Sequence, residues 1–121
     1  MGVTHVHHVG IPVYDLARAE AFYRDVLGIG RSETPSYNPS SIVFLSCGVS
    51  MIHLIRYGDE IERPGRKGVH WAFEVDDLEE AYQRVSASGC EIEISISPRP
   101  DSTLYFFFYD PEGNRIELCR H

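Results

Sequence analysis

An internal repeat constrains the fold of this chain more than any other feature. The stretch HVGIPVYDL, His8–Leu16, returns in the second half as HWAFEVDDL, His70–Leu78, with histidine, valine, aspartate and leucine in register. Self-similarity of this kind indicates two copies of one structural unit. A chain of 121 residues is long enough for one core but not for two independent ones. We therefore expect a single domain made of two modules, about 1–60 and 61–121.

Each half predicts the same order of elements: a strand, a helix and then about three strands. Residues 6–13 alternate as a strand does, and Asp15 follows as a helix N-cap. Gly28 is suited to end that helix. Further strands are predicted at 42–47, 50–56, 69–75, 91–96, 104–109 and 115–120, a second helix runs from Asp77 to about Ser88, and polar segments lie at 32–41, 57–68 and 97–103. The pattern is that of an α+β fold in which each module is a small sheet with a helix on one face.

Charge and cysteine content narrow the class of partner and the compartment. The net charge is −7, from 18 acidic and 11 basic residues, which argues against nucleic acid or an anionic membrane as the main partner. No long apolar run and no secretory signal are evident, so we expect no membrane span. The three cysteines, Cys47, Cys90 and Cys119, share no metal-binding spacing. Reduced thiols in a cytoplasmic protein are the simplest interpretation.

Strand alternation places the repeated histidines on one kind of surface. In both opening strands the apolar side chains fall on the face that must cover the helix, which leaves His8 and His70 on the opposite face. The closing strands match as well, because MIHLIR at 51–56 aligns with RIELCR at 115–120. His53 then corresponds to Glu117, and both have the parity of the uncovered face.

Four potential ligands therefore occupy two pairs of repeat-equivalent positions. Each of these residues, taken singly, is more often structural, and a glutamate on an edge strand also prevents unwanted pairing. Together, three imidazoles and one carboxylate suit a divalent first-row metal such as Zn, Ni, Co, Mn or Fe, with water completing the shell. The repeat thus predicts a metal site made of His8, His53, His70 and Glu117.

The sequence resembles the vicinal oxygen chelate superfamily, which includes glyoxalase I, methylmalonyl-CoA epimerase, fosfomycin-resistance thiol transferases, extradiol dioxygenases and bleomycin-resistance proteins. The motifs that carry the resemblance are HHVGIPVYDLARAEAFYRDVLG, HWAFEVDDLEEA and YDPEGNRIEL. It implies two βαβββ modules in tandem, forming a paired, cupped mixed β-sheet with helices on the outside. It also implies a small-molecule substrate and a homodimer, with each site built from modules of one chain or of two.

The resemblance also implies ligand roles. His8, His70 and Glu117 match positions that recur in the metal-binding members. His53 matches the position that glyoxalase I fills with glutamate and the epimerase with glutamine, so a residue able to ligate there favours the lyase and isomerase branch. Histidine at this position departs from both patterns. Bleomycin-binding members lack the ligand set.

In the lyase and epimerase members the metal binds neighbouring substrate oxygens and stabilises an enediolate or enolate while a carboxylate moves a proton. Glu117 is the candidate base, and Glu74 has the strand parity of a second acid or base. Arg115 and Cys119 share that parity and are candidates for substrate binding. Arg115 can hold a carboxylate or phosphate, although a surface salt bridge is an equal alternative.

Three functions remain open from the sequence. The first is a metal-dependent lyase or isomerase acting on neighbouring oxygens, for example in a 2-oxoaldehyde thiol adduct or an acyl thioester. The second is an extradiol-type dioxygenase with Fe(II) held by His8, His70 and Glu117, although the common enzymes of that class are longer. The third is a non-catalytic protein that binds a small molecule such as an antibiotic, which the four aligned ligands disfavour.

Overall fold

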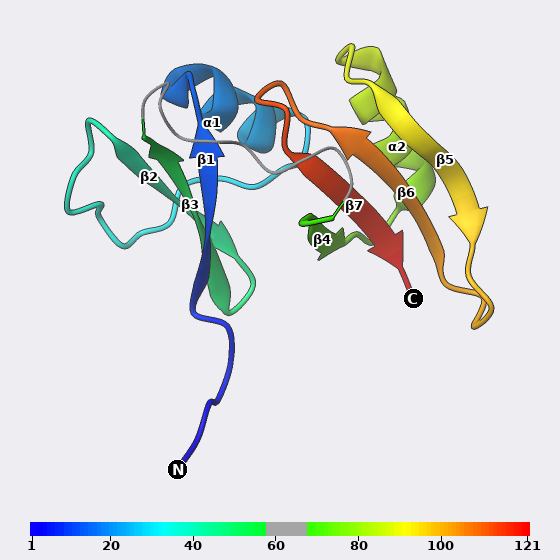
Figure 1. Cartoon of the computed structure of the whole chain (residues 1–121), viewed down its shortest axis with the longest axis horizontal. Coiled ribbons are helices and arrows are strands. Elements are labelled where there is room, and N and C mark those ends of the chain that lie inside the picture. Colours follow the sequence, from blue (N-terminus) through cyan, green and yellow to red (C-terminus); the bar gives the residue numbers. More distant parts are fainter. Residues whose placement is uncertain (58–67) are drawn as a thin grey trace. The chain divides into compact units, whose positions relative to one another are not determined.

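The chain folds as two units of similar design, each a β-sheet with one helix across one face (Figure 1). The computed structural model describes residues 1–57 and 68–121, and the units are Met1–Ile61 and Glu62–His121. The predicted linker at 57–68 lies outside the described residues except at its two ends. Within the described chain, neither helix has the length and apolar character needed to cross a membrane.

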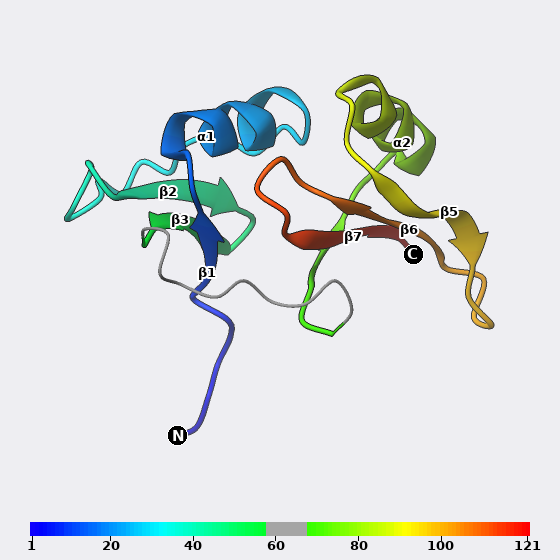
Figure 2. The ribbon, with the colours of Figure 1, turned by 45° about the horizontal axis from the view of Figure 1, so that its top comes forward.

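The first unit has a sheet in the order β1-β3-β2, with β1 parallel to β3 and β2 antiparallel to it. Helix α1 lies across one face of this sheet (Figure 2). The elements of the unit are β1 (His8–Val13), α1 (Leu16–Asp25), β2 (Ile42–Cys47) and β3 (Ser50–Arg56).

The second unit has a sheet in the order β4-β7-β6-β5, again with its first and last strands parallel. Helix α2 covers one face. The ring of its Tyr82 packs edge-on against Phe106 of the sheet, with the ring centroids 5.0 Å apart. The elements are β4 (Trp71–Glu74), α2 (Leu78–Ala87), β5 (Ile92–Pro98), β6 (Leu104–Tyr109) and β7 (Arg115–Arg120).

Both helices begin at the aspartates of the repeat. Asp15 accepts a hydrogen bond from the backbone N–H of Arg18, and Asp77 accepts one from Glu80, each at 3.0 Å. These bonds satisfy N–H groups that the first helical turn cannot pair internally. The chain leaves α1 through Gly28, whose φ of +74° lies in the left-handed region that favours glycine. The predicted helix boundaries are confirmed to within a few residues.

The α+β class and the tandem modules are confirmed, but the first unit has fewer strands than the resemblance implies. Where β5 stands in the second unit, the first shows only an isolated bridge between Arg31 and Leu45. The loop that follows contains Pro35 and Pro39, which have no N–H to donate to a ladder. The predicted strand 69–75 is also shorter, so His70 lies one residue before β4.

The core lies on the helix-covered face of each sheet. In β3 the alternate residues Ile52 and Leu54 are buried there, and in β7 Ile116 and Leu118 are their counterparts. The intervening residues, His53 and Glu117, point to the opposite face and are buried too. Buried polar side chains need partners, so the surroundings of His53 and Glu117 decide what these two residues can bind.

The turn DPEGN, 110–114, connects β6 to β7 through a buried aspartate. The Oδ1 atom of Asp110 accepts hydrogen bonds from the backbone N–H groups of Glu112 at 2.9 Å and Asn114 at 2.8 Å. Gly113 has φ +84°, a value that a residue with a Cβ adopts with difficulty. The turn therefore sets the register in which β7 presents Glu117.

Replacing Asp110 with alanine should destabilise the fold, because two N–H groups in a buried turn lose their acceptor. Each costs about 1–3 kcal/mol, so we expect the free energy of unfolding to fall by about 2–6 kcal/mol. Urea unfolding measures this. An Asp25→Ala control, which removes an exposed carboxylate paired with Arg24, should change stability little. Equal effects of the two substitutions would show that the turn does not depend on Asp110.

Candidate metal centre

The sheet face without a helix carries two of the four predicted ligands in each unit. In the first unit these are His8 on β1 and His53 on β3. In the second they are His70, just before β4, and Glu117 on β7. The parallel pairing of first and last strands makes the residues of each pair neighbours, because β1 lies beside β3 and β4 beside β7.

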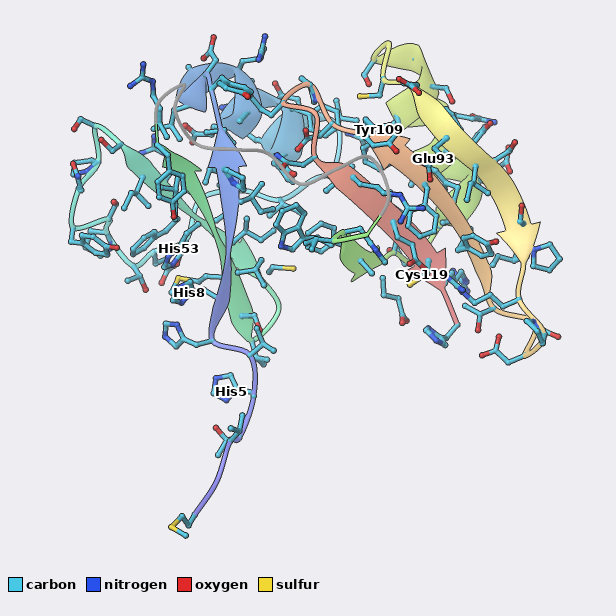
Figure 3. All side chains as sticks on the ribbon, in the orientation of Figure 1. His5, His8, His53, Glu93, Tyr109 and Cys119 are labelled. Carbon is cyan, nitrogen blue, oxygen red and sulfur yellow. The ribbon has the colours of Figure 1, made fainter. Side chains whose placement is uncertain are left out.

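His53 is held between two parallel rings. The imidazole of His8 stacks on one side with ring centroids 3.8 Å apart and an interplanar angle of 13°. The ring of Phe44, its partner across the β2–β3 ladder, stacks on the other side at 3.8 Å and 10°. Figure 3 shows the side chains of His8 and His53 next to each other on their two strands. This stack fixes the orientation of the imidazole.

The environment of His53 favours a neutral imidazole with a buried ring nitrogen that no described group satisfies. The residue is only 5% exposed, and its Nε2 atom has no hydrogen-bond partner among the described residues. Burial, with smaller contributions from the charges of His8 and His7, lowers the pKa of His53. A buried nitrogen without a partner costs free energy unless a ligand satisfies it. A metal ion is one such ligand, so the residue fits the predicted role.

In the second pair, a ring nitrogen of His70 faces a carboxylate oxygen of Glu117. The Nε2 atom of His70 lies 3.3 Å from Oε1 of Glu117, while its Nδ1 atom lies 3.1 Å from the carbonyl oxygen of Gly68. A carbonyl only accepts, so the contact with Gly68 requires a proton on Nδ1, which leaves the Nε2 lone pair facing the carboxylate. The guanidinium of Arg115 only donates, and its Nη1 atom lies 3.5 Å from the same Nδ1, which fits the other tautomer, in which Nε2–H donates to Glu117. A backbone carbonyl on the far nitrogen is a common partner of a metal-binding histidine.

In the tautomer with the proton on Nδ1, Nε2 of His70 and Oε1 of Glu117 are two acceptors that face each other, and a metal ion between them would satisfy both. Two ligands bound to one zinc ion at about 2.0–2.2 Å with tetrahedral angles lie about 3.4 Å apart. The 3.3 Å separation of Nε2 and Oε1 is therefore compatible with shared coordination.

Glu117 has a second partner that the sequence does not predict. The Nη2 atom of Arg99 lies 2.6 Å from Oε2 of Glu117. The guanidinium also lies over the ring of Tyr105, 4.0 Å from its centroid. Arg99 occurs in the Pro-Arg-Pro break after β5, and only the β5–β6–β7 arrangement brings it to the carboxylate.

Arg115, the predicted substrate anchor, is engaged by a carboxylate of its own sheet. Its Nε and Nη2 atoms lie 3.0 and 2.6 Å from Oε1 of Glu93, and the hydroxyl of Tyr109 donates to the other oxygen of that carboxylate. The guanidinium lies over Phe107 at 4.0 Å. Figure 3 shows Glu93 and Tyr109 on neighbouring strands, pointing toward each other. The role of Arg115 in substrate binding stays a prediction.

The remaining predicted residues, Glu74 and Cys119, lie opposite each other in the β4–β7 register. Glu74 is exposed and pairs with His121, whose Nδ1 atom is 2.9 Å from its Oε1. Burial and the nearby carboxylates of Glu117 and Glu74 raise the pKa of the Cys119 thiol. The thiol is therefore protonated at neutral pH and a poor nucleophile.

The four predicted ligands thus form two pairs, and the part of the chain that is described holds no cluster of three or more metal-binding side chains. The residues that sequence reasoning missed are Arg99, Glu93 and Phe44. Phe44 and Glu93 carried a usable signal, because strand parity places them on the same face as the ligands. Arg99 carried none, because it lies in a turn.

The predicted rim segment at 32–41 borders a hollow in the first unit. The cavity measures about 240 Å³ and is lined by Thr34, Pro35, Pro39 and Phe44, among others. Phe44 is therefore shared between this cavity and the stack on His53.

Comparison with known proteins identifies the family. The Glyoxalase/Bleomycin resistance protein/Dioxygenase superfamily matches residues 5–118. A lactoylglutathione lyase from Salmonella typhimurium is 34% identical over 120 residues, which cover 92% of this chain and 88% of that protein. The structure of lactoylglutathione lyase from Agrobacterium tumefaciens superimposes with a TM-score of 0.73 at 27% identity, over 99% of this chain and 96% of that one. A fosfomycin resistance protein from Listeria monocytogenes shares the fold with a TM-score of 0.79 at 22% identity, over 99% and 95%. The chain belongs to the Glyoxalase/Bleomycin resistance protein/Dioxygenase superfamily.

Proposed function

We propose that this chain is a metal-dependent lyase or isomerase of the glyoxalase type, which acts on a small substrate with two neighbouring oxygens. His8, His53, His70 and Glu117 would hold one divalent ion. The preferred substrate class is the thiol adduct of a 2-oxoaldehyde, since lyases named for lactoylglutathione are among the relatives. We also infer a homodimer, as the resemblance implies, and a cytoplasmic location, as the cysteine content indicates.

The observation that carries this proposal is the buried Nε2 atom of His53. A non-catalytic binding cleft has no need of an unsatisfied imidazole nitrogen at its floor, because an apolar residue would stack as well between His8 and Phe44. A metal ligand at His53 also distinguishes the proposed four-residue site from the triad of His8, His70 and Glu117, which suffices for a dioxygenase.

The residues of the chain divide the chemistry between them. When bound, the metal would act as a Lewis acid that lowers the energy of an enediolate-like species. Glu117 would take the proton from the substrate carbon and return it to the neighbouring carbon, and its position on β7 beside His70 supports this role. The net reaction moves one hydrogen from carbon to the neighbouring carbon and one proton from the hydroxyl oxygen to the neighbouring oxygen, and it consumes no co-reactant.

The direct test is an assay of tag-free protein loaded in turn with Zn²⁺, Ni²⁺, Co²⁺ or Mn²⁺. The hemithioacetal of methylglyoxal and glutathione is the substrate, and thioester formation is followed by its ultraviolet absorbance. We expect activity with at least one metal and its loss on chelation. Turnover that is unaffected by chelators would contradict the proposal. Oxygen consumption with catechols after Fe²⁺ loading would instead favour the dioxygenase.

Replacing His53 with phenylalanine should separate metal binding from stability. The new ring keeps the stack on Phe44, and the buried nitrogen without a partner disappears, so the unfolding midpoint of the metal-free protein should stay equal or rise. Metal affinity should fall by at least about tenfold, because a ligand is lost. Calorimetric titration with Zn²⁺ and thermal unfolding without metal provide the two measurements.

The matched control for this substitution is His5→Phe. His5 is an exposed histidine whose Nδ1 atom contacts only its neighbour Thr4 among the bonds described. It should leave metal affinity unchanged. Equal affinities of the His53→Phe variant and the unaltered protein would remove His53 from the ligand set.

Replacing Glu117 with glutamine should remove the proton acceptor while keeping an oxygen that can bind metal. General-base catalysis contributes about 10²- to 10⁴-fold, and kcat should fall by that factor with a smaller change in KM. Glu74→Gln is the comparison, since Glu74 is the second predicted acid or base. A large loss of kcat in Glu74→Gln with little loss in Glu117→Gln would assign the base to Glu74.

A further inference from the structure

Arg99 and His70 together occupy both oxygens of the Glu117 carboxylate. Nη2 of Arg99 is 2.6 Å from Oε2, and Nε2 of His70 is 3.3 Å from Oε1. The carboxylate side chain is only 9% exposed. A carboxylate so far from water requires a positive partner, and Arg99 is the permanently charged group that meets this need.

The ion pair is unequal, because only one of its two members is held firmly. Glu117 lies within the β7 strand, whereas the Arg99 side chain is 41% exposed and extends from a turn. The backbone of Arg99 is anchored, since its N–H donates to the carbonyl of Thr103 at 2.8 Å. The flexible part is therefore the side chain alone, and one end of it can leave the carboxylate without unfolding the hairpin.

The ring of Tyr105 provides a place for the guanidinium that does not depend on Glu117. Arg99 lies 4.0 Å from the ring centroid, a distance at which a cation and an aromatic face attract each other. A guanidinium released from Glu117 would thus keep part of its stabilisation on Tyr105.

Arg115 on the same sheet shows a different arrangement. Its side chain is 13% exposed, and Glu93 binds it through two nitrogens. That guanidinium has its own carboxylate and makes no described ion pair with Glu117. The two arginines therefore differ in how far solvent reaches them and in which carboxylate they bind.

We propose that Arg99 is an exchangeable counter-ion of Glu117, which neutralises the buried carboxylate in the metal-free protein and is displaced when a divalent cation binds. The inference rests on the proposed function, because it takes Glu117 as a metal ligand. The dication and the guanidinium compete for one carboxylate, so Arg99 stabilises the metal-free fold and weakens metal binding.

The sign of the effect on metal affinity tests the inference. Arg99→Gln removes the competing charge and should tighten Zn²⁺ binding by about 10- to 100-fold, the size usual for changes around a metal site but in the opposite direction. The same variant should lower the unfolding midpoint of the metal-free protein, because Glu117 loses its partner. Arg99→Lys keeps the charge and should bind Zn²⁺ nearly as the unaltered protein does.

Arg84→Gln is the matched control. It removes one positive charge from the exposed surface of α2, where Arg84 pairs with Glu80 at 3.7 Å. Its Zn²⁺ affinity should equal that of the unaltered protein, which separates the local competition from the change in net charge.

The outcomes distinguish the two proposals. Zn²⁺ affinity that is unchanged or weaker in Arg99→Gln overturns the exchange, since an arginine that merely positions Glu117 would lower both stability and affinity when removed. Failure of the unaltered protein to bind any divalent metal overturns the proposed function, and the exchange with it. In the unaltered protein, the NMR signal of the Arg99 guanidinium, identified by its absence in Arg99→Lys, should shift as Zn²⁺ is added. A signal that stays fixed at saturating Zn²⁺ also overturns the exchange.

Discussion

The parallel pairing of the first and last strands within each unit is the constraint on which the rest of the structure depends. Because β1 lies beside β3 and β4 beside β7, residues far apart in the sequence become neighbours on one sheet face. The helix covers the other face, where Ile52, Leu54, Ile116 and Leu118 form the core. The uncovered face carries the polar side chains of His53 and Glu117 together with the rings of Phe44 and Phe107, and their proximity follows from the strand pairing.

The two units then treat their polar residues in different ways. In the first, His53 is stacked between His8 and Phe44, and its environment is aromatic and nearly uncharged. In the second, Glu117 pairs with Arg99 and Glu93 pairs with Arg115, and each guanidinium lies over an aromatic ring of β6. The rings of LYFFFY alternate between two roles. Phe106 and Phe108 fill the core, while Tyr105 and Phe107 lie under guanidinium groups.

Membership of the superfamily accounts for the scaffold but does not assign the reaction. Lyases and a fosfomycin resistance protein share this fold with the chain, so the residues outside the conserved framework must distinguish them. For this chain, our proposals assign that distinction to His53 and Arg99.

The sequence by itself determined the repeat, the boundaries of both helices, the strands at 42–47, 50–56 and 115–120, and the parity of His53 and Glu117. These follow from local rules, because alternation and capping are set by neighbours along the chain. Only the tertiary structure decided that Nε2 of His53 has no hydrogen-bond partner among the described residues, that Arg115 is bound to Glu93, and that Arg99 meets Glu117. Those contacts join side chains across strand ladders and turns, and no local pattern in the sequence encodes the distance between them.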